Sequence, residues 1–162
     1  HSGVNEGAIL NGKPPLKCWP EEKWREFVRL FKAAHPDILV VQLGGSQSPK
    51  FDFVDVCLTQ KTKLTEIAAL IDNALLHVDG ESGLAQLTRW LKTKAVVFFA
   101  HTSPQMFGLP KNRSVAADKC RPCMWLVGGQ WYTVCLCGHK TCQNLDAITP
   151  QTVLAAVEEE LH

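Results

Sequence analysis

The residues best suited to chemistry lie close together near the C-terminus. From Cys120 to Cys142 the sequence reads CRPCMWLVGGQWYTVCLCGHKTC, which holds five of the chain's seven cysteines and one histidine in 23 residues. Such a cluster can bind a metal, form disulfides or make a redox centre. We expect a reducing compartment, which favours a metal site over two disulfides. A redox centre is disfavoured because Cys120 does not open a helix after a thioredoxin-like strand.

The composition of the whole chain excludes several classes of protein. Its 162 residues favour a single domain spanning 1–162. Lys and Arg number 17 and Asp and Glu 16, so we expect neither duplex nucleic acid nor an anionic membrane as the main partner. The sequence contains no transmembrane run and no secretory signal pattern, so we predict a cytoplasmic protein, with the inner face of the membrane as a further option. Because the chain does not begin with Met, we expect a fragment.

Helical and strand patterns alternate along the chain and are separated by short turns containing glycine. The predicted helices are 20–34, 64–71, 84–91 and 149–162, and the predicted strands are 38–43, 53–58, 74–78 and 95–100. This order predicts an α/β fold that is Rossmann-like, with a mostly parallel sheet and helices on both faces. Ligands bind such sheets beyond the carboxyl ends of the strands, so the loops after Leu43, Val78 and Ala100 are candidates.

The segment HVDGESGLAQLTRW, His77 to Trp90, carries the clearest binding pattern. A strand ends, a turn with two glycines follows, and a helix begins at Leu84. A helix N-terminus offers backbone N–H groups to a phosphate, and Gly83 permits close approach to the backbone. Glu81 is suited to accept hydrogen bonds from sugar hydroxyls. An ordinary strand-to-helix turn explains the spacing equally well.

Several segments in order resemble the C-terminal half of glycosyltransferase family 9, the heptosyltransferase family of the two-domain GT-B fold. HSGV at the N-terminus is similar to the family's opening loop, and CWPEEKW to its "KRWP" helix entry. The other matching segments are LVVQLGG, TKLTEIAALI, VDGESGLAQL and VVFFAHTSPQMFGLPKN, the last two being similar to the family's "DSGxxHL" turn and "VVLFGPTxPxxFG" strand and loop.

Three positions depart from the family pattern. Glu81 stands where the family has Asp, and Gln86 stands where it has His. Gln86 can donate a hydrogen bond to a diphosphate but carries no charge. Ala100 and His101 replace the family's glycine turn after the last strand. The His101 imidazole is a candidate substitute for the imidazole that the family has at position 86. ADP-heptose is therefore not assumed to be the donor.

The resemblance implies a glycosyltransferase domain that binds a nucleotide-diphosphate sugar, for transfer to a glycan, lipopolysaccharide or protein acceptor. In the family the acceptor and its activating carboxylate lie in an N-terminal domain, so we expect this fragment to be inactive alone. The first strand of such a sheet is central, and here it must come from the first residues, a preceding segment or another chain. The candidate substrate-binding residues are Lys17, Gly44, Gly45, Glu81, Ser82, Gly83, Leu84, Gln86, Thr102 and Ser103.

The resemblance also extends into the cysteine cluster, since some family members carry a C-x2-C pair followed by C-x6-C. It implies a structural zinc or iron site at Cys120, Cys123, Cys135 and Cys142, with Cys137 and His139 as alternative ligands. The site would hold the Cys-rich insertion 118–145 and orient the helix 149–162. Trp125, Trp131 and Tyr132 either cover this site or form a patch for a partner.

Two other classes of function stay open. The chain can be a noncatalytic, metal-stabilised α/β interaction module with a degenerate nucleotide pocket. It can also be a redox or metal sensor. The sequence does not identify the sugar, the acceptor, the metal, the oligomeric state or a preceding domain.

Overall fold

The computed structural model describes residues 16–45, 48–126 and 135–162. In chain order its elements are α1 (Glu21–Ala34), β1 (Val41–Gln42), β2 (Val56–Cys57), α2 (Leu64–Asp72), β3 (His77–Gly80), α3 (Gly83–Leu87), the 3-10 turn η1 (Thr88–Trp90), β4 (Ala95–Phe99), α4 (Pro104–Phe107), β5 (Arg113–Ala116), the 3-10 turn η2 (Met124–Leu126), α5 (Gln143–Ala147) and α6 (Pro150–Leu161).

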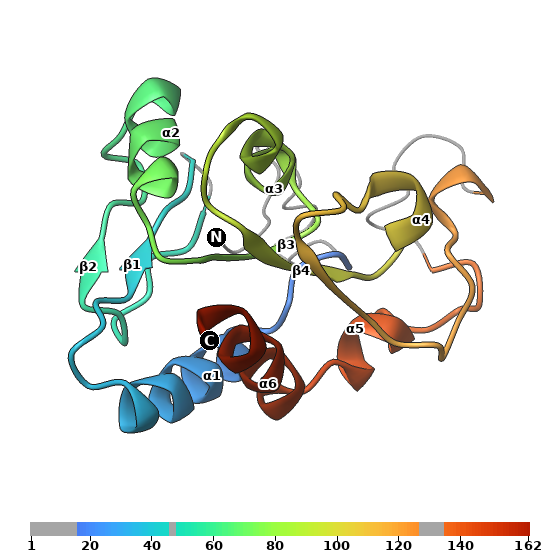
Figure 1. Cartoon of the computed structure of the whole chain (residues 1–162). Helices are drawn as coiled ribbons and strands as arrows, with labels where there is room; N and C mark the ends of the chain where they lie inside the picture. The colour runs from blue at the N-terminus through green and yellow to red at the C-terminus, as the bar shows by residue number, and fades with distance from the viewer. Residues whose placement is uncertain (1–15, 46–47, 127–134) are drawn as a thin grey trace.

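All the strand pairs are parallel. β1 pairs with β2 in a two-stranded sheet, and β3, β4 and β5 form a three-stranded sheet with β4 in the middle. Figure 1 shows α1, α5 and α6 on one side of the strands and α2, α3 and α4 on the other. The prediction of an α/β fold with a parallel sheet and helices on both faces is therefore confirmed for the described residues.

β4 separates two cores because its alternate side chains point to opposite faces. Phe98 lies on the α1 side, with its ring centroid 5.2 Å from that of Trp19 and 5.5 Å from that of Trp24. Phe99 and Val97 lie on the other side and pack with Ala85 of α3. Every residue of β4 is buried, as expected for a parallel strand covered on both faces.

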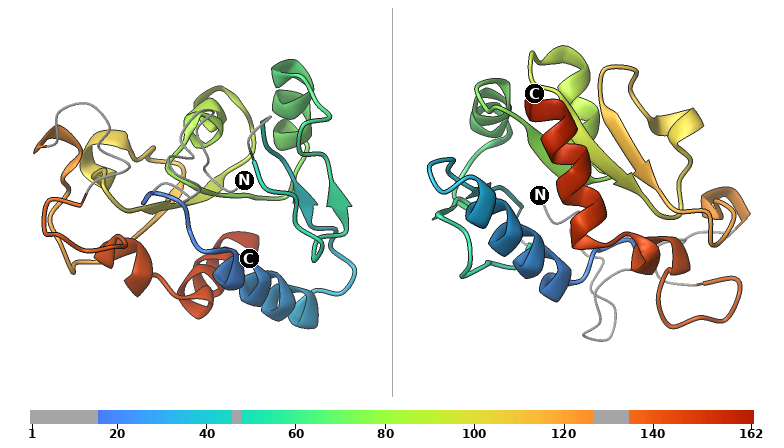
Figure 2. Two further views of the ribbon diagram at one scale, coloured as in Figure 1. Left: turned by 180° about the vertical axis from the view of Figure 1, so that it is seen from behind. Right: turned by 60° about the horizontal axis from the view of Figure 1, so that its bottom comes forward.

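α1 and α6 form the layer beneath the three-stranded sheet and lie side by side (Figure 2). The predicted apolar face of α1 is buried, and it consists of Trp24, Phe27, Val28 and Phe31. α6 begins as predicted, with Pro150 in its first turn and the Thr149 hydroxyl accepting a hydrogen bond from the Thr152 N–H at 3.1 Å. Within the described residues, none of the helices is long and apolar enough to cross a membrane.

The strands nearest the N-terminus are shorter than predicted. Of the predicted strand 38–43 only Val41–Gln42 forms a strand, and of the predicted strand 53–58 only Val56–Cys57 does. At the start of the first of these strands the Asp55 carboxylate accepts the Val40 N–H at 2.8 Å, so that a side chain takes the place of a sheet partner there. The third strand begins at His77 instead of Ala74, and the helix 84–91 divides into α3 and η1.

The two sheets do not pair with each other through described residues. Between them the described residues line a largely apolar cavity of about 750 Å³, bounded by α1, α6, β1 and β3. The HSGV loop lies outside the described residues, and so does the predicted central first strand if the first residues form it.

Candidate functional site

The loops that follow β3 and β4 meet at the carboxyl ends of these strands, and Lys17 lies beside them. Glu81, after β3, accepts a hydrogen bond from the side chain of Thr102, after β4. Lys17 interacts electrostatically with both Asp79 and Glu81. Of the predicted substrate-binding residues, the structure therefore brings Lys17, Glu81 and Thr102 together.

Burial shifts the pKa of Lys17 and the pKa of Glu81 in opposite directions. Loss of water around Lys17 lowers its pKa, and the nearby charges of Cys18, Glu81 and Asp79 oppose that shift. Burial raises the pKa of Glu81, while Lys17 and the Thr102 hydrogen bond oppose it. The two side chains therefore partly neutralise each other at a half-buried surface.

The turn from Gly80 to Gly83, called the donor turn below after the role that the sequence resemblance predicts for it, is held by hydrogen bonds of its own. The Ser82 hydroxyl accepts the Leu84 N–H at 3.1 Å and the Ala85 N–H at 3.2 Å, so it caps α3. The same hydroxyl donates to the buried carboxylate of Asp79. α3 has five residues, and two of its first N–H groups are thus already taken by Ser82.

Gly83 and Gly44 differ in the space around the position that a side chain would occupy. A Cβ on Gly83 would meet nothing within 4 Å, so a ligand can approach this backbone. A Cβ on Gly44 would lie 2.6 Å from the Ser48 Oγ, so Gly44 is required for packing inside its own loop. Gly44 and Gly45 follow β1, which belongs to the other sheet.

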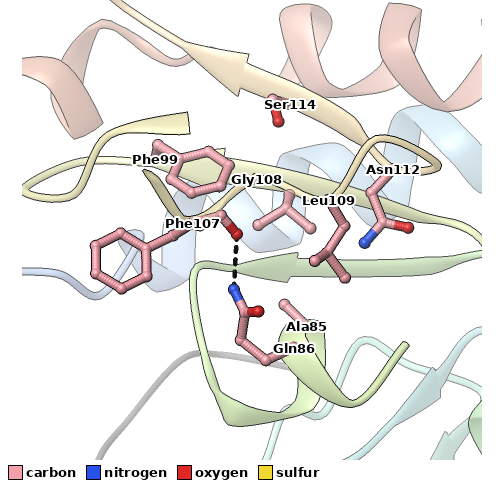
Figure 3. Close-up of a pocket in the computed structure, with 9 residues that line it drawn as sticks. Ala85, Gln86, Phe99, Phe107, Gly108, Leu109, Asn112 and Ser114 are labelled. Atoms are coloured by element: carbon pink, nitrogen blue, oxygen red, sulfur yellow. Dashed lines mark hydrogen bonds between the residues drawn. The ribbon is translucent and has the colours of Figure 1, made fainter. Parts of the chain in front are cut away.

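Gln86 points away from the donor turn. Its amide Nε2 donates to the Phe107 carbonyl at 2.7 Å and ties α3 to α4, as Figure 3 shows. Ala85, Phe99 and Leu109 lie around this bond and pack closely. Ser103 caps α4, since its hydroxyl accepts the Gln105 N–H at 3.2 Å. Gln86 and Ser103 therefore already have structural partners.

His101 is buried next to these loops and is 3% exposed. Burial, together with the charge of Lys17, lowers its pKa to about 4. Its imidazole is therefore neutral near pH 7, so it does not supply a positive charge to a bound anion there. Its carbonyl accepts the Cys123 and Met124 N–H groups at 3.0 and 3.2 Å, which joins the Cys-rich segment to the loop after β4.

All seven cysteines lie among the described residues, and each is a free thiol. The sulfurs of Cys120 and Cys137 are 4.0 Å apart. Thiolates that share a tetrahedral zinc lie about 3.8 Å apart, given Zn–S bonds of about 2.3 Å. Nevertheless, the described residues contain no group of three or more His, Cys, Asp or Glu side chains arranged to hold a metal. The metal-binding character of this segment is therefore not supported by the arrangement, although its ligand types suit zinc or iron.

The ends of the Cys-rich segment are held by Asn144 of α5. Its Oδ1 accepts the Lys119 and Cys120 N–H groups at 3.0 and 2.8 Å. Its Nδ2 donates to the carbonyls of Cys120, at 2.7 Å, and Ala100, at 3.2 Å. Trp125 is 68% exposed and stacks on Phe107 with ring centroids 6.4 Å apart, so it does not cover a buried sulfur cluster. Trp131 and Tyr132 lie outside the described residues.

Sequence reasoning missed two residues that organise these regions, Asp79 and Asn144. Asp79 is the third of the four residues of β3 and is buried, and a carboxylate on the inward face of a strand is a signal that it has a buried partner. Asn144 carries no such signal, because its four partners come from segments distant in the sequence.

A parallel α/β sheet with polar groups gathered beyond the carboxyl ends of its strands has the architecture of nucleotide-binding α/β proteins. The chain belongs to glycosyltransferase family 9 (heptosyltransferase), whose family model matches residues 8–125. No curated protein matches the chain.

Solved structures with the same fold come from this family. The chain is similar to E. coli ADP-heptose lps heptosyltransferase II (19% identity, TM-score 0.69, 99% of this chain and 44% of that one). It is also similar to the family 9 glycosyl transferase from Veillonella parvula DSM 2008 (18%, 0.69, 98% and 45%) and to E. coli heptosyltransferase WaaC with ADP (22%, 0.64, 89% and 40%). The chain thus spans less than half the length of these structures.

Proposed function

We propose that this chain is the donor-binding part of a glycosyltransferase and binds a nucleotide-diphosphate sugar at the donor turn. The observation that carries the proposal is the meeting of Lys17, Glu81 and Thr102 beside the open backbone of Gly83. Family membership supports a sugar-transfer role, and one structural neighbour was solved with ADP. A noncatalytic interaction module is not favoured by these findings.

In this proposal each residue has a distinct task. Lys17 faces the diphosphate, whose negative charge grows as it leaves the sugar. Gly83 allows the diphosphate to approach the backbone, and Glu81 and Thr102 accept or donate hydrogen bonds at sugar or ribose hydroxyls. Ser82, Leu84 and Gln86 hold the turn in place. Gly44, Gly45 and Ser103 shape the loops on either side.

The reaction proposed is substitution at the anomeric carbon of the donor sugar. The bond from that carbon to the diphosphate oxygen breaks as a new bond to the acceptor oxygen forms. The acceptor hydroxyl gives its proton to a carboxylate that we assign to an N-terminal acceptor-binding domain or chain. The chain alone is then expected to bind the donor and to transfer little sugar.

Calorimetric titration with ADP-, UDP- and GDP-linked sugars tests the proposal. We expect saturable binding of one of them, weakened roughly tenfold or more by Lys17→Met or Glu81→Ala, since each removes a charged hydrogen-bonding partner. Glu22→Ala is the matched control, because Glu22 is exposed in the first turn of α1. Absence of binding to all three, or equal loss in the control, would contradict the proposal.

We further propose that the Cys-rich segment binds a structural zinc or iron through Cys120, Cys123, Cys135 and Cys142, with Cys137 and His139 as alternatives. The support is chemical: burial raises the pKa of the Cys123 thiol, and the charges of the four other cysteines of the segment, which lie close enough to act on it, raise that pKa further. Binding would require the thiols to draw together, since they do not converge as placed.

Elemental analysis of the purified chain tests the metal proposal. We expect about one equivalent of zinc or iron, lost in Cys120→Ser and Cys123→Ser and kept in Cys57→Ser, whose thiol is remote from the segment. A metal-free chain with seven titratable thiols and unchanged stability in the presence of a chelator would exclude the site.

A further inference from the structure

A buried carboxylate lies directly behind the donor turn. Asp79, at the end of β3, is 0% exposed. Its Oδ2 accepts a hydrogen bond from the Ser82 hydroxyl and lies 3.3 Å from Nε2 of His77, which is also buried. His77 and Asp79 are two residues apart on a strand, so their side chains share one face of the sheet. Burying a carboxylate at this position costs free energy unless it is hydrogen-bonded to partners such as these.

The geometry leaves the Ser82 hydroxyl with no hydrogen-bonding capacity for a ligand. A hydroxyl has one proton and two lone pairs. Its proton goes to Asp79, and its oxygen accepts the N–H groups of Leu84 and Ala85. The Asp79 carboxylate can only accept a hydrogen bond, so the Ser82 proton must point toward it. Both lone pairs of the Ser82 hydroxyl then point toward the start of α3.

The contacts of Ser82 determine where its two neighbours lie. The Ser82 carbonyl accepts the Gln86 N–H at 3.0 Å, and the Glu81 N–H donates to the Phe98 carbonyl of β4 at 3.0 Å. With the backbone fixed on both sides, the Glu81 carboxylate is directed to Thr102 and Lys17, and Gly83 presents its open side. The charge of Asp79 also acts on Lys17 and favours the protonated form of that amine.

We propose that Asp79 is the positioning residue of the donor turn: through the Ser82 hydroxyl it holds Glu81 and Gly83 in the arrangement that receives a nucleotide-diphosphate sugar. It does not contact the donor itself. The effect on donor affinity rests on the proposed function, whereas the effect on the turn does not.

Hydrogen exchange in the ligand-free chain tests the effect on the turn. Asp79→Asn is expected to accelerate exchange of the Leu84 and Ala85 amides roughly tenfold or more, because an amide side chain can itself donate and no longer fixes the Ser82 proton. The Val97 amide of β4 should keep its protection. Asp37→Asn, at an exposed position, is the matched control. Unchanged exchange at Leu84 and Ala85, or equal acceleration at Val97, overturns the inference.

A double-mutant cycle tests whether Asp79 acts through Ser82. Ser82→Ala should weaken donor binding about as much as Asp79→Asn, and the double variant no more than either single one, because both remove the same link. Ser82→Thr keeps the hydroxyl and should retain most of the affinity and amide protection. Full additivity, or loss of both properties in Ser82→Thr, contradicts the inference. These two Ser82 variants also decide the matter if Asp79→Asn does not fold.

The outcomes separate the two proposals. A wild-type chain that binds no nucleotide sugar overturns the proposed function, and the exchange measurement then still decides the role of Asp79. A wild-type chain that binds the donor with the same affinity as Asp79→Asn leaves the proposed function standing and overturns the inference.

Discussion

The donor turn and the Cys-rich segment are adjacent, yet they are stabilised in opposite ways. In the donor turn, Asp79, Ser82 and the first N–H groups of α3 satisfy one another within a few residues. In the Cys-rich segment Asn144 and the His101 carbonyl form hydrogen bonds that tie it to the rest of the chain, two short turns bond Leu126 to Cys123 and Gly138 to Cys135, and the described thiols do not converge. The first region is therefore stabilised by its own nearest neighbours, and the described part of the second is held by Asn144 and by the loop after β4.

The largest expected effect comes from removing the anchor of the Cys-rich segment. Asn144→Ala leaves two N–H groups and two carbonyls without their partner, so we expect the free energy of unfolding to fall by about 3 kcal/mol. Urea denaturation measures this change. Asn73→Ala is the control: Asn73 is exposed and donates one hydrogen bond, to the Ala69 carbonyl, so it should cost less than about 1 kcal/mol. Equal losses would show that Asn144 is no anchor.

Replacing Gly44 and Gly83 by alanine, one at a time, should separate an effect on packing from an effect on ligand binding. Gly44→Ala places a Cβ 2.6 Å from the Ser48 Oγ, and we expect it to destabilise the chain by about 2 kcal/mol. Gly83→Ala meets no atom within 4 Å, so stability should change by less than about 0.5 kcal/mol while donor affinity falls roughly tenfold. Thermal unfolding and calorimetry measure the two quantities. A Gly83→Ala variant with unchanged affinity would place the donor elsewhere.

The bond between α3 and α4 should contribute less. Gln86→Ala removes the N–H group that donates a hydrogen bond to the Phe107 carbonyl. We expect the free energy of unfolding, measured by urea denaturation, to fall by about 1 kcal/mol. Donor affinity should fall by a smaller factor than in Glu81→Ala, because Gln86 supports the turn from behind. If Gln86→Ala abolished binding without loss of stability, Gln86 would be a direct ligand.

The smallest effect concerns pH. Burial raises the pKa of Glu81, and a diphosphate bound nearby would raise it further. Binding is then coupled to proton uptake, so donor affinity should increase as the pH is lowered toward this pKa, and we expect a change of no more than about threefold. Glu81→Gln should remove that dependence. Affinity that rises with pH in the wild type would contradict this sign.

Local patterns in the sequence predicted the elements that have one clear buried face. The spacing of Trp24, Phe27, Val28 and Phe31 predicted α1, and the continuous apolar run 95–100 predicted β4. β5 was missed because its residues, RSVA, are half polar and lie at a sheet edge. α4 and α5, with four and five residues, are too short to show a period.

The candidate site could be predicted in part for the same reason. The loops were found because they follow buried strands, and Glu81, Thr102 and Lys17 do meet there. The partner of Gln86 could not be predicted, since Phe107 is 21 residues away in the sequence and reaches it only through the packing of α3 against α4. The bond from Ser82 to Asp79 is local, but it was missed because Asp79 was assigned to the turn and not to the strand. Cysteine spacing likewise indicates proximity along the chain but does not fix convergence of the sulfurs.

Backbone and side-chain NMR shifts, recorded while ADP-, UDP- and GDP-linked sugars are added in separate titrations, test most directly whether the donor turn binds a nucleotide-diphosphate sugar. Saturable changes should appear at the Gly83 and Thr102 amides and at the Lys17 side chain, with none at Leu70 of α2. Shifts confined to residues around the cavity between the two sheets, or no shifts with any of the three nucleotide sugars, would contradict the assignment.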